Sequence, residues 1–75
     1  MSKVTLNCLG ESCPTPLIRI RKKMGSLRKD DILVVKIDHS CALKSIPEWA
    51  HQMGYEIEII EISSHNWEVI IEKAQ

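Results

Sequence analysis

The spacing of the apolar residues changes several times along this chain of 75 residues, and these changes limit the folds that it can adopt. Residues 3–9 alternate between apolar and polar, as a half-buried strand does. Residues 32–37 form an almost continuous apolar run, which is typical of a central strand covered on at least one face. Residues 55–62 and 67–73 predict two further strands, joined as an antiparallel hairpin by the polar turn between them.

Two segments between these strands have the pattern of amphipathic helices. From residue 14 onward the apolar residues that recur at helical spacing are Leu17, Ile20, Met24 and Leu27. In the second segment Ser45 and Glu48 have the spacing of a capping box, and Gly54 is a C-terminal stop. A start near Ser40 with a bend at Pro47 fits the second segment equally well. The expected buried stripe of this helix is Ile46, Trp49, Ala50 and Met53.

The order of the predicted elements is strand, helix, strand, helix, strand, strand. This order favours an α/β (α+β) two-layer sandwich, β-α-β-α-β-β, in which a mixed four-stranded sheet carries two helices on one face. The first strand, helix and strand should form a right-handed parallel unit. We expect a single domain over residues 1–75, without a membrane span, because no stretch approaches the ~20 apolar residues that a span needs. The first ten residues lack the pattern of a signal peptide, so a cytoplasmic location is expected.

The chain has three cysteines, and Cys13 occupies the least ordinary position among them. An odd number argues against the disulfide framework of a small secreted protein. Pro14, at the first position of the predicted helix, makes Cys13 the N-cap residue, and Pro16 removes a second amide without a helical partner. The amides of Thr15 and Leu17 and the helix dipole favour a thiolate there. Since cysteines at helix N-termini have pKa values of roughly 3.5–7.5, below the usual ~8.5, we predict that Cys13 is an exposed nucleophile.

Charge is distributed unevenly, although the formal net charge is zero. Residues 1–29 contain seven basic residues and one acidic residue, whereas residues 30–75 contain three basic and nine acidic residues. The basic residues that follow Cys13 on its helix are Arg19, Arg21, Lys22 and Lys23. They can dock an acidic partner, steer an anion such as thiosulfate, or only solvate the helix. Nucleic acid is not an expected partner, because three aromatic residues offer no stacking platform and the net charge is zero.

The stretch "LNCLGESCPTPLIRIRKK" resembles the TusA/SirA-like family of small sulfur carriers. The mark of that family is a Cys-Pro-x-Pro motif after a first strand and a glycine-containing turn, here Gly10 followed by Cys13, Pro14, Thr15 and Pro16. The stretch "IDHSCALKSIPEWAHQMGYEIE" is similar to the YeeD-like branch, whose members accompany a membrane thiosulfate transporter. The family often has an acid where this chain has Asn7, which affects only a local contact.

The resemblance implies a sulfurtransferase that accepts sulfane sulfur on Cys13 as a persulfide and relays it between donor and acceptor proteins. Thiosulfate is the small-molecule substrate that this chemistry suggests. The alternative is a soluble partner of a membrane thiosulfate transporter, held at the inner face of the membrane, which receives or breaks down thiosulfate through the same cysteine. No cofactor is expected. No metal site is expected either, because the cysteine spacings do not match a zinc knuckle.

Two residues that follow the strand at 32–37 are further candidates. If this strand is the parallel neighbour of the first, the connections after both strands leave the same edge of the sheet, so that Cys41 lies on the same rim as Cys13. There Cys41 can resolve a persulfide or form a transient disulfide. His39, beside Cys41, can lower the pKa of a thiol or bind an anion. Cys8 continues the inward side of the first strand, and we expect it to be structural.

Overall fold

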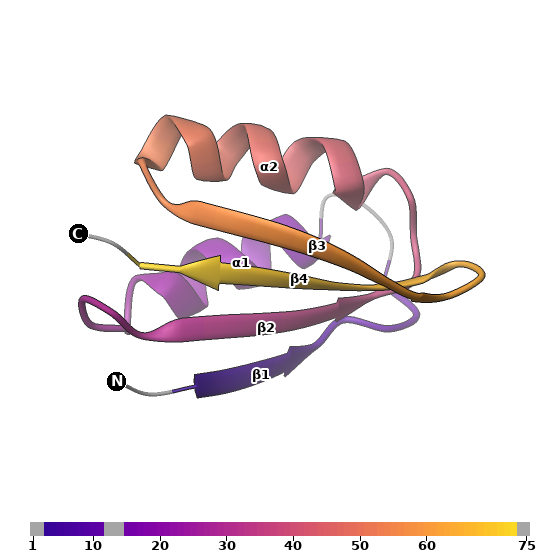
Figure 1. Ribbon diagram of the computed structural model, residues 1–75, viewed down its shortest axis with the longest axis horizontal. Coiled ribbons are helices and arrows are strands. Elements are labelled where there is room, and N and C mark those ends of the chain that lie inside the picture. Colours follow the sequence, from indigo (N-terminus) through magenta and orange to yellow (C-terminus); the bar gives the residue numbers. More distant parts are fainter. Residues whose placement is uncertain (1–2, 12–14, 74–75) are drawn as a thin grey trace.

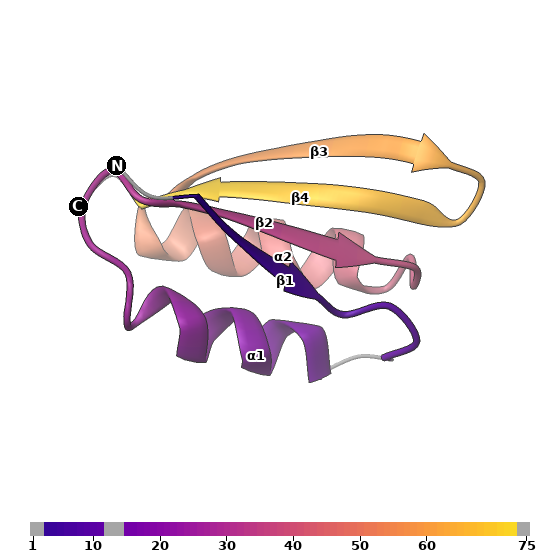
Figure 2. The same cartoon turned by 90° about the horizontal axis from the view of Figure 1, so that it is seen from below.

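The structure is a computed structural model that describes residues 3–11 and 15–73. Its elements, in chain order, are β1 (Lys3–Asn7), α1 (Thr15–Met24), β2 (Ile32–Ile37), α2 (Ala42–Met53), β3 (Glu56–Ser63) and β4 (Asn66–Glu72). The predicted order β-α-β-α-β-β is therefore confirmed. Both helices lie on the same side of the sheet, which confirms the two-layer sandwich (Figure 2).

The sheet has the strand order β1-β2-β4-β3. Strands β1 and β2 are parallel, whereas β4 is antiparallel to both of its neighbours, β2 and β3. Strands β1, β2 and β3 therefore all run in one direction and end at the same edge of the sheet (Figure 1). This edge, which carries the connections after β1 and β2 and the turn between β3 and β4, is called the site edge below.

The core lies between the sheet and the helices. Alternation on β1 turns Val4 and Leu6 toward the core, and Cys8 continues this side with no exposed surface. The other fully or almost fully buried apolar residues are Ile20 and Met24 of α1, Leu33, Val35 and Ile37 of β2, Ala42, Ile46 and Ala50 of α2, and Val69 and Ile71 of β4. The stripe predicted for the first helix is confirmed at Ile20 and Met24, while Leu17 and Leu27 are partly buried against the core.

The second helix begins earlier than a capping box at Ser45 requires, so that prediction is wrong and the start near Ser40 is the better one. Cys41 is the N-cap residue, and Pro47 lies inside the helix. Packing explains the extra turn, because starting at Ala42 buries Ala42 together with Ile46 against the core. Pro47 is tolerated since it removes a single backbone bond, that to the carbonyl of Leu43.

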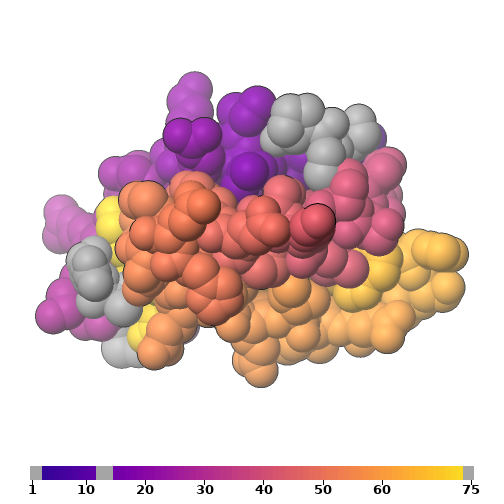
Figure 3. Space-filling model, turned by 90° about the horizontal axis from the view of Figure 1, so that it is seen from above, coloured from indigo at the N-terminus to yellow at the C-terminus, as the bar shows by residue number. Residues whose placement is uncertain are grey.

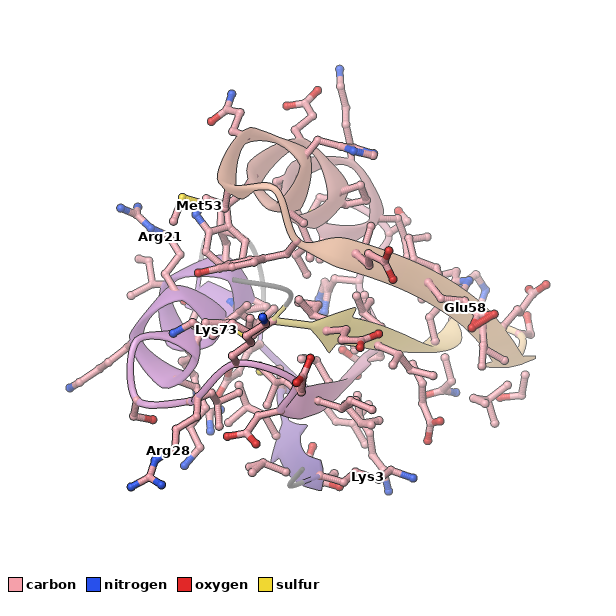
Figure 4. The ribbon with its side chains drawn as sticks, turned by 60° about the vertical axis from the view of Figure 1, so that its left-hand side comes forward. Lys3, Arg21, Arg28, Met53, Glu58 and Lys73 are labelled. Atoms are coloured by element: carbon pink, nitrogen blue, oxygen red, sulfur yellow. The ribbon has the colours of Figure 1, made fainter. Side chains whose placement is uncertain are left out.

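The end of the second helix was partly predicted correctly. Gly54 caps it in the left-handed region, with φ 78°, and its amide donates to the carbonyl of His51. Met53 is 47% exposed, so its assignment to the buried stripe was wrong, whereas Trp49 is half-buried. Met53 is the last residue before the glycine, where the chain turns away toward β3, and its side chain lies beside α1 rather than under α2 (Figure 4).

The C-terminal end of α1 is fastened by a residue from the far end of the chain. Lys73 Nζ donates to the carbonyl oxygens of Met24 and Leu27, at 2.9 Å and 2.8 Å. These carbonyls have no partner within the helix, and a positive charge also favours the negative end of the helix dipole. Helix α1 is therefore held at this end, and its opposite end points to the site edge.

Candidate functional site

Two connections meet at the site edge, residues 8–11 after β1 and residues 38–41 after β2. The amide of Gly10 donates to both carboxylate oxygens of Asp38, each at 3.0 Å. Gly10 has φ 81°, a conformation that L side chains rarely adopt, although a Cβ there would meet no atom within 4 Å. The glycine is thus required by its backbone conformation, and this conformation aims its amide at the neighbouring connection.

Asp38 is a site residue that the sequence analysis did not single out. The amide of Gly10 and, less strongly, His39 hold the pKa of the Asp38 carboxyl below its usual range. His39 Nδ1 lies 2.8 Å from Asp38 Oδ1, so this histidine is engaged with a carboxylate. The sequence feature that could have pointed to Asp38 is its position directly after a parallel strand. The glycine turn of the neighbouring parallel strand lies at the same edge of the sheet.

A second tie joins α1 to the connection after β1. Arg19 Nη1 donates to the carbonyl oxygen of Asn7 at 3.0 Å and forms an ion pair with Glu11 Oε2. Arg19 was expected among the docking residues, but its guanidinium is occupied by these intramolecular partners. Glu11, which the sequence analysis did not use, is the last described residue before the Cys13 motif, and its ion pair with Arg19 ties it to α1.

The three cysteines differ sharply in what the structure shows of them. Cys8 is a buried free thiol, and burial raises its pKa to about 11, with the neighbouring Glu11 carboxylate adding to the effect. Cys8 is therefore a poor nucleophile at neutral pH, as expected of a structural residue. Cys41 is exposed at the head of α2 and is disulfide-bonded. Cys13 and Pro14 lie outside the described residues, so their predicted N-cap geometry stays a prediction.

The described start of α1 belongs to the same motif. Thr15, its first residue, is exposed, and Pro16 is fully buried. A buried proline in the first turn anchors the helix to the core without needing a backbone donor. The site edge therefore combines the head of α1, the Gly10 turn and the connection that leads to Cys41.

The remaining predicted docking residues lie along α1, away from this edge. Arg21 and Lys22 are exposed, and Lys23 is half-buried. Arg21 and Lys22 line a groove of about 440 Å³ between α1 and α2, whose other walls include Ile18 and Met53, which are 56% and 47% exposed. Figure 4 shows Arg21 and Met53 side by side at the mouth of this groove. Figure 3 shows the two helices next to each other on this face of the molecule.

The described residues form neither a metal-ligand cluster nor a membrane-spanning helix. Among residues 3–11 and 15–73, no group of three or more histidine, cysteine and acidic side chains is placed to hold a metal ion. None of the described helices is long and apolar enough to cross a membrane. The described polar and sulfur groups at the site edge are the disulfide-bonded sulfur of Cys41, the Asp38 carboxylate, the His39 imidazole and the Gly10 amide.

Comparison with known proteins gives a consistent result. Residues 4–73 match the sulfurtransferase TusA family. A candidate sulfur carrier protein of Thermotoga maritima is 32% identical over 68 residues, covering 89% of this chain and 86% of that protein. The candidate sulfur carrier protein TsuB of Escherichia coli is 30% identical over 70 residues, covering 92% of this chain and 93% of that protein.

A solved structure supports the same relationship. The crystal structure of a SirA-like protein from Desulfitobacterium hafniense superposes with a TM-score of 0.87 and 29% sequence identity, covering 96% of this chain and 99% of that chain. The similarity therefore extends over almost the whole chain and supports the two-layer sandwich as the fold of the family.

Proposed function

Because the chain belongs to the sulfurtransferase TusA family, we propose that Cys13 accepts sulfane sulfur and carries it as a persulfide to an acceptor protein. The observation that carries the proposal is the start of α1 at Thr15, two residues after Cys13. The positive end of a ten-residue helix favours a thiolate over a thiol at this distance. The buried Cys8, with its raised pKa, is unsuited to the same role.

The proposed reaction needs no cofactor. The Cys13 thiolate attacks the outer sulfur of thiosulfate, a new S–S bond forms, the old S–S bond breaks, and sulfite leaves with the electron pair. A persulfide on a donor protein reacts in the same way and leaves as a thiolate. An acceptor thiolate then attacks the outer sulfur of the Cys13 persulfide, which restores the Cys13 thiolate and moves one sulfur onward.

Cys41 has the position of a second thiol in this cycle. Its thiolate attacks the inner sulfur of the Cys13 persulfide, hydrosulfide leaves, and an intramolecular disulfide forms, which an external dithiol must later reduce. Support comes from two facts: Cys41 is exposed and disulfide-bonded, and Cys8 is a buried free thiol. The bridge from Gly10 to Asp38 ties together the two connections that carry these cysteines.

The partners follow from the groove between the helices. Its exposed Ile18 and Met53 and its cations, Arg21 and Lys22, fit an acidic partner segment with an apolar side chain. We propose that sulfur donors and acceptors dock there, along α1 and toward the C-terminal ends of both helices. The likeness to the YeeD-like branch adds a second candidate role, in which the partner is a membrane thiosulfate transporter and the protein acts at the cytoplasmic face of the membrane.

The decisive experiment is intact-mass analysis after incubation of the reduced protein with thiosulfate and, separately, with a persulfide donor protein. The wild type should gain one sulfur atom, and a cyanide wash should remove it. Cys13→Ser should gain none, whereas Cys8→Ala should behave as the wild type if it remains folded. Cys41→Ser should retain the added sulfur longer than the wild type, because the release step through Cys41 is missing.

Two results would contradict the proposal. If the wild type gains no sulfur in either treatment, the protein is not a sulfur carrier, and only a docking role remains. Equal sulfur gain by Cys13→Ser moves the chemistry to another residue.

A further inference from the structure

The face of the sheet opposite the helices carries a division of charge across its strands. In Figure 2 both helices lie on one side, and the described residues leave the other side of the sheet uncovered. The strands β1 and β2 bring Lys3 and Lys36 to this open face. The strands β4 and β3 bring four acids to it, Glu68 and Glu72 from β4 and Glu56 and Glu58 from β3.

Apolar side chains lie between and beyond these charges. Val34 and Ile70 pair across the middle of the open face, at the centre of the sheet. At the site edge Leu9 and Ile62 are 45% and 57% exposed and line a common groove of about 200 Å³. Figure 4 shows Lys3 and Glu58 at opposite margins of the sheet, whereas Lys36 and Glu68 pair with each other where the basic and acidic halves meet.

We propose that the open face is the interface of a symmetric dimer of this chain. A two-fold axis parallel to the strands places β1 over β3 of the second copy and β2 over β4. The register of the sheet then sets Lys3 opposite Glu56 and Lys36 opposite Glu68 of the second copy. It also sets Val34 opposite Ile70 of the second copy. Every such contact occurs twice, because the interface is isologous.

The other two-fold axis in this plane is disfavoured by the same registers. An axis perpendicular to the strands places each strand over its own copy with reversed direction. It brings Glu58 against Glu58 of the second copy, and Glu68 against Glu72 twice. Like charges in register across an interface oppose association, so charge complementarity selects the axis parallel to the strands. That axis also places both site edges at the same end of the dimer.

The size of the face predicts a weak dimer. Four strands about 4.8 Å apart and six residues rising about 3.3 Å each give a face of roughly 400 Å² in projection. A standard stable interface buries about 800 Å² per partner, so this one lies near or below that size. Aligned sheets cross at about 30°, so in the proposed dimer the central pairs lie closest and the long side chains of Lys3 and Glu56 reach across the wider gap at the corners. We therefore expect association in the micromolar range rather than a permanent dimer.

The test uses charge reversal at Lys3 and Glu56, which are exposed on opposite edge strands and not paired with each other within one copy. Sedimentation velocity of the reduced wild type over a concentration series should show a monomer–dimer equilibrium. Lys3→Glu and Glu56→Lys should each weaken it about tenfold or more, because each homodimer then holds two like-charge contacts. An equimolar mixture of the two variants should recover wild-type affinity, since both edge contacts of the mixed dimer are again opposite in charge.

Matched controls separate this effect from net charge. Lys44→Glu and Glu48→Lys make the same charge changes on exposed positions of α2 and should leave the dimer unchanged. A monomeric wild type at the highest concentration overturns the proposal, as does equal dimerisation of Lys3→Glu. A mixture of Lys3→Glu and Glu56→Lys that stays monomeric, beside a dimeric wild type, overturns the proposed axis. None of these outcomes depends on the sulfur chemistry of Cys13.

Discussion

Cys8 and Cys41 each follow one of two parallel strands, at the same edge of one sheet, yet their environments are opposite. Cys8 continues the inward side of β1, is buried among core residues, and has a pKa raised by burial. Cys41 lies three residues further from its strand, exposed at the head of α2. Both cysteines lie at the site edge, so closeness to this edge does not set their reactivity. What differs is whether the cysteine faces the core, as Cys8 does, or the solvent, as Cys41 does.

The largest expected difference is in alkylation. At pH 8 in the reduced native protein, iodoacetamide should modify Cys41 at least about 100-fold faster than Cys8, because a thiol with a pKa of about 11 is almost entirely protonated and Cys8 is also occluded. Peptide mapping by mass spectrometry at timed intervals measures both rates. Comparable rates in the native protein would mean that the two environments are not opposite.

A matched pair of substitutions should sharpen the contrast in stability. Cys8→Asp should lower the free energy of unfolding by about 3 kcal/mol or more, because it buries a carboxylate without a cationic partner of its own. Cys41→Asp should change it by no more than about 1 kcal/mol, and toward stabilisation, because a negative charge at the N-terminal end of α2 is favoured by the helix dipole. Urea unfolding of both variants with reductant present measures the difference, and a similar loss in the two would break the comparison.

The raised pKa of Cys8 also predicts a stability change at alkaline pH. The unfolded thiol ionises near ~8.5, whereas the folded one ionises at about 11. The contribution of the buried thiol is therefore fully present below the unfolded pKa and is lost as pH rises through the folded pKa. The stability of the wild type relative to Cys8→Ala, measured by thermal unfolding, should fall between pH 8 and 11. A constant difference between them would show that Cys8 is not ionised on unfolding.

The smallest effect concerns the bridge between the two connections. Asp38→Ala should lower the stability only slightly, because it removes an acceptor for the Gly10 amide at a partly exposed position. Amide exchange at Gly10 should be faster in this variant. In the wild type the lowered pKa means that the bridge is present at neutral pH and is lost only as pH falls through the folded value. Unchanged exchange at Gly10 in Asp38→Ala would remove Asp38 from the site.

Most of the fold could be read from the hydrophobic period, because both helices and the strands β1 and β4 turn one apolar face toward a single core; β3 does so only weakly, since Ile57 is its one half-buried residue. The start of α2 could not, since the capping spacing of Ser45 and Glu48 is a local signal. The burial of Ala42, a long-range contact, outweighs it. Met53 was misassigned for a related reason, because the chain leaves the helix at the next residue, Gly54.

The candidate site was predicted in outline but not in its contacts. The sequence placed Cys13 and Cys41 on the same edge through the parallel pairing of two strands. The structure confirms the shared edge for the described parts of the two connections, residues 8–11 and 38–41, while Cys13 lies outside the described residues. The role of Asp38 depends on a bond across 28 positions of the chain, and no local pattern reveals such a bond. Arg19 was taken for a free cation, because its pairing with Glu11 requires the turn that only the fold defines.

The central claim is that Cys13, at the head of α1, is kept as a thiolate that takes up sulfur. The most direct measurement is the pH dependence of alkylation of Cys13 in the Cys41→Ser variant, in which the buried Cys8 is the remaining other thiol. The account predicts a midpoint well below the ~8.5 of a free cysteine. A midpoint at or above that value, or no reaction in the folded protein, would contradict it.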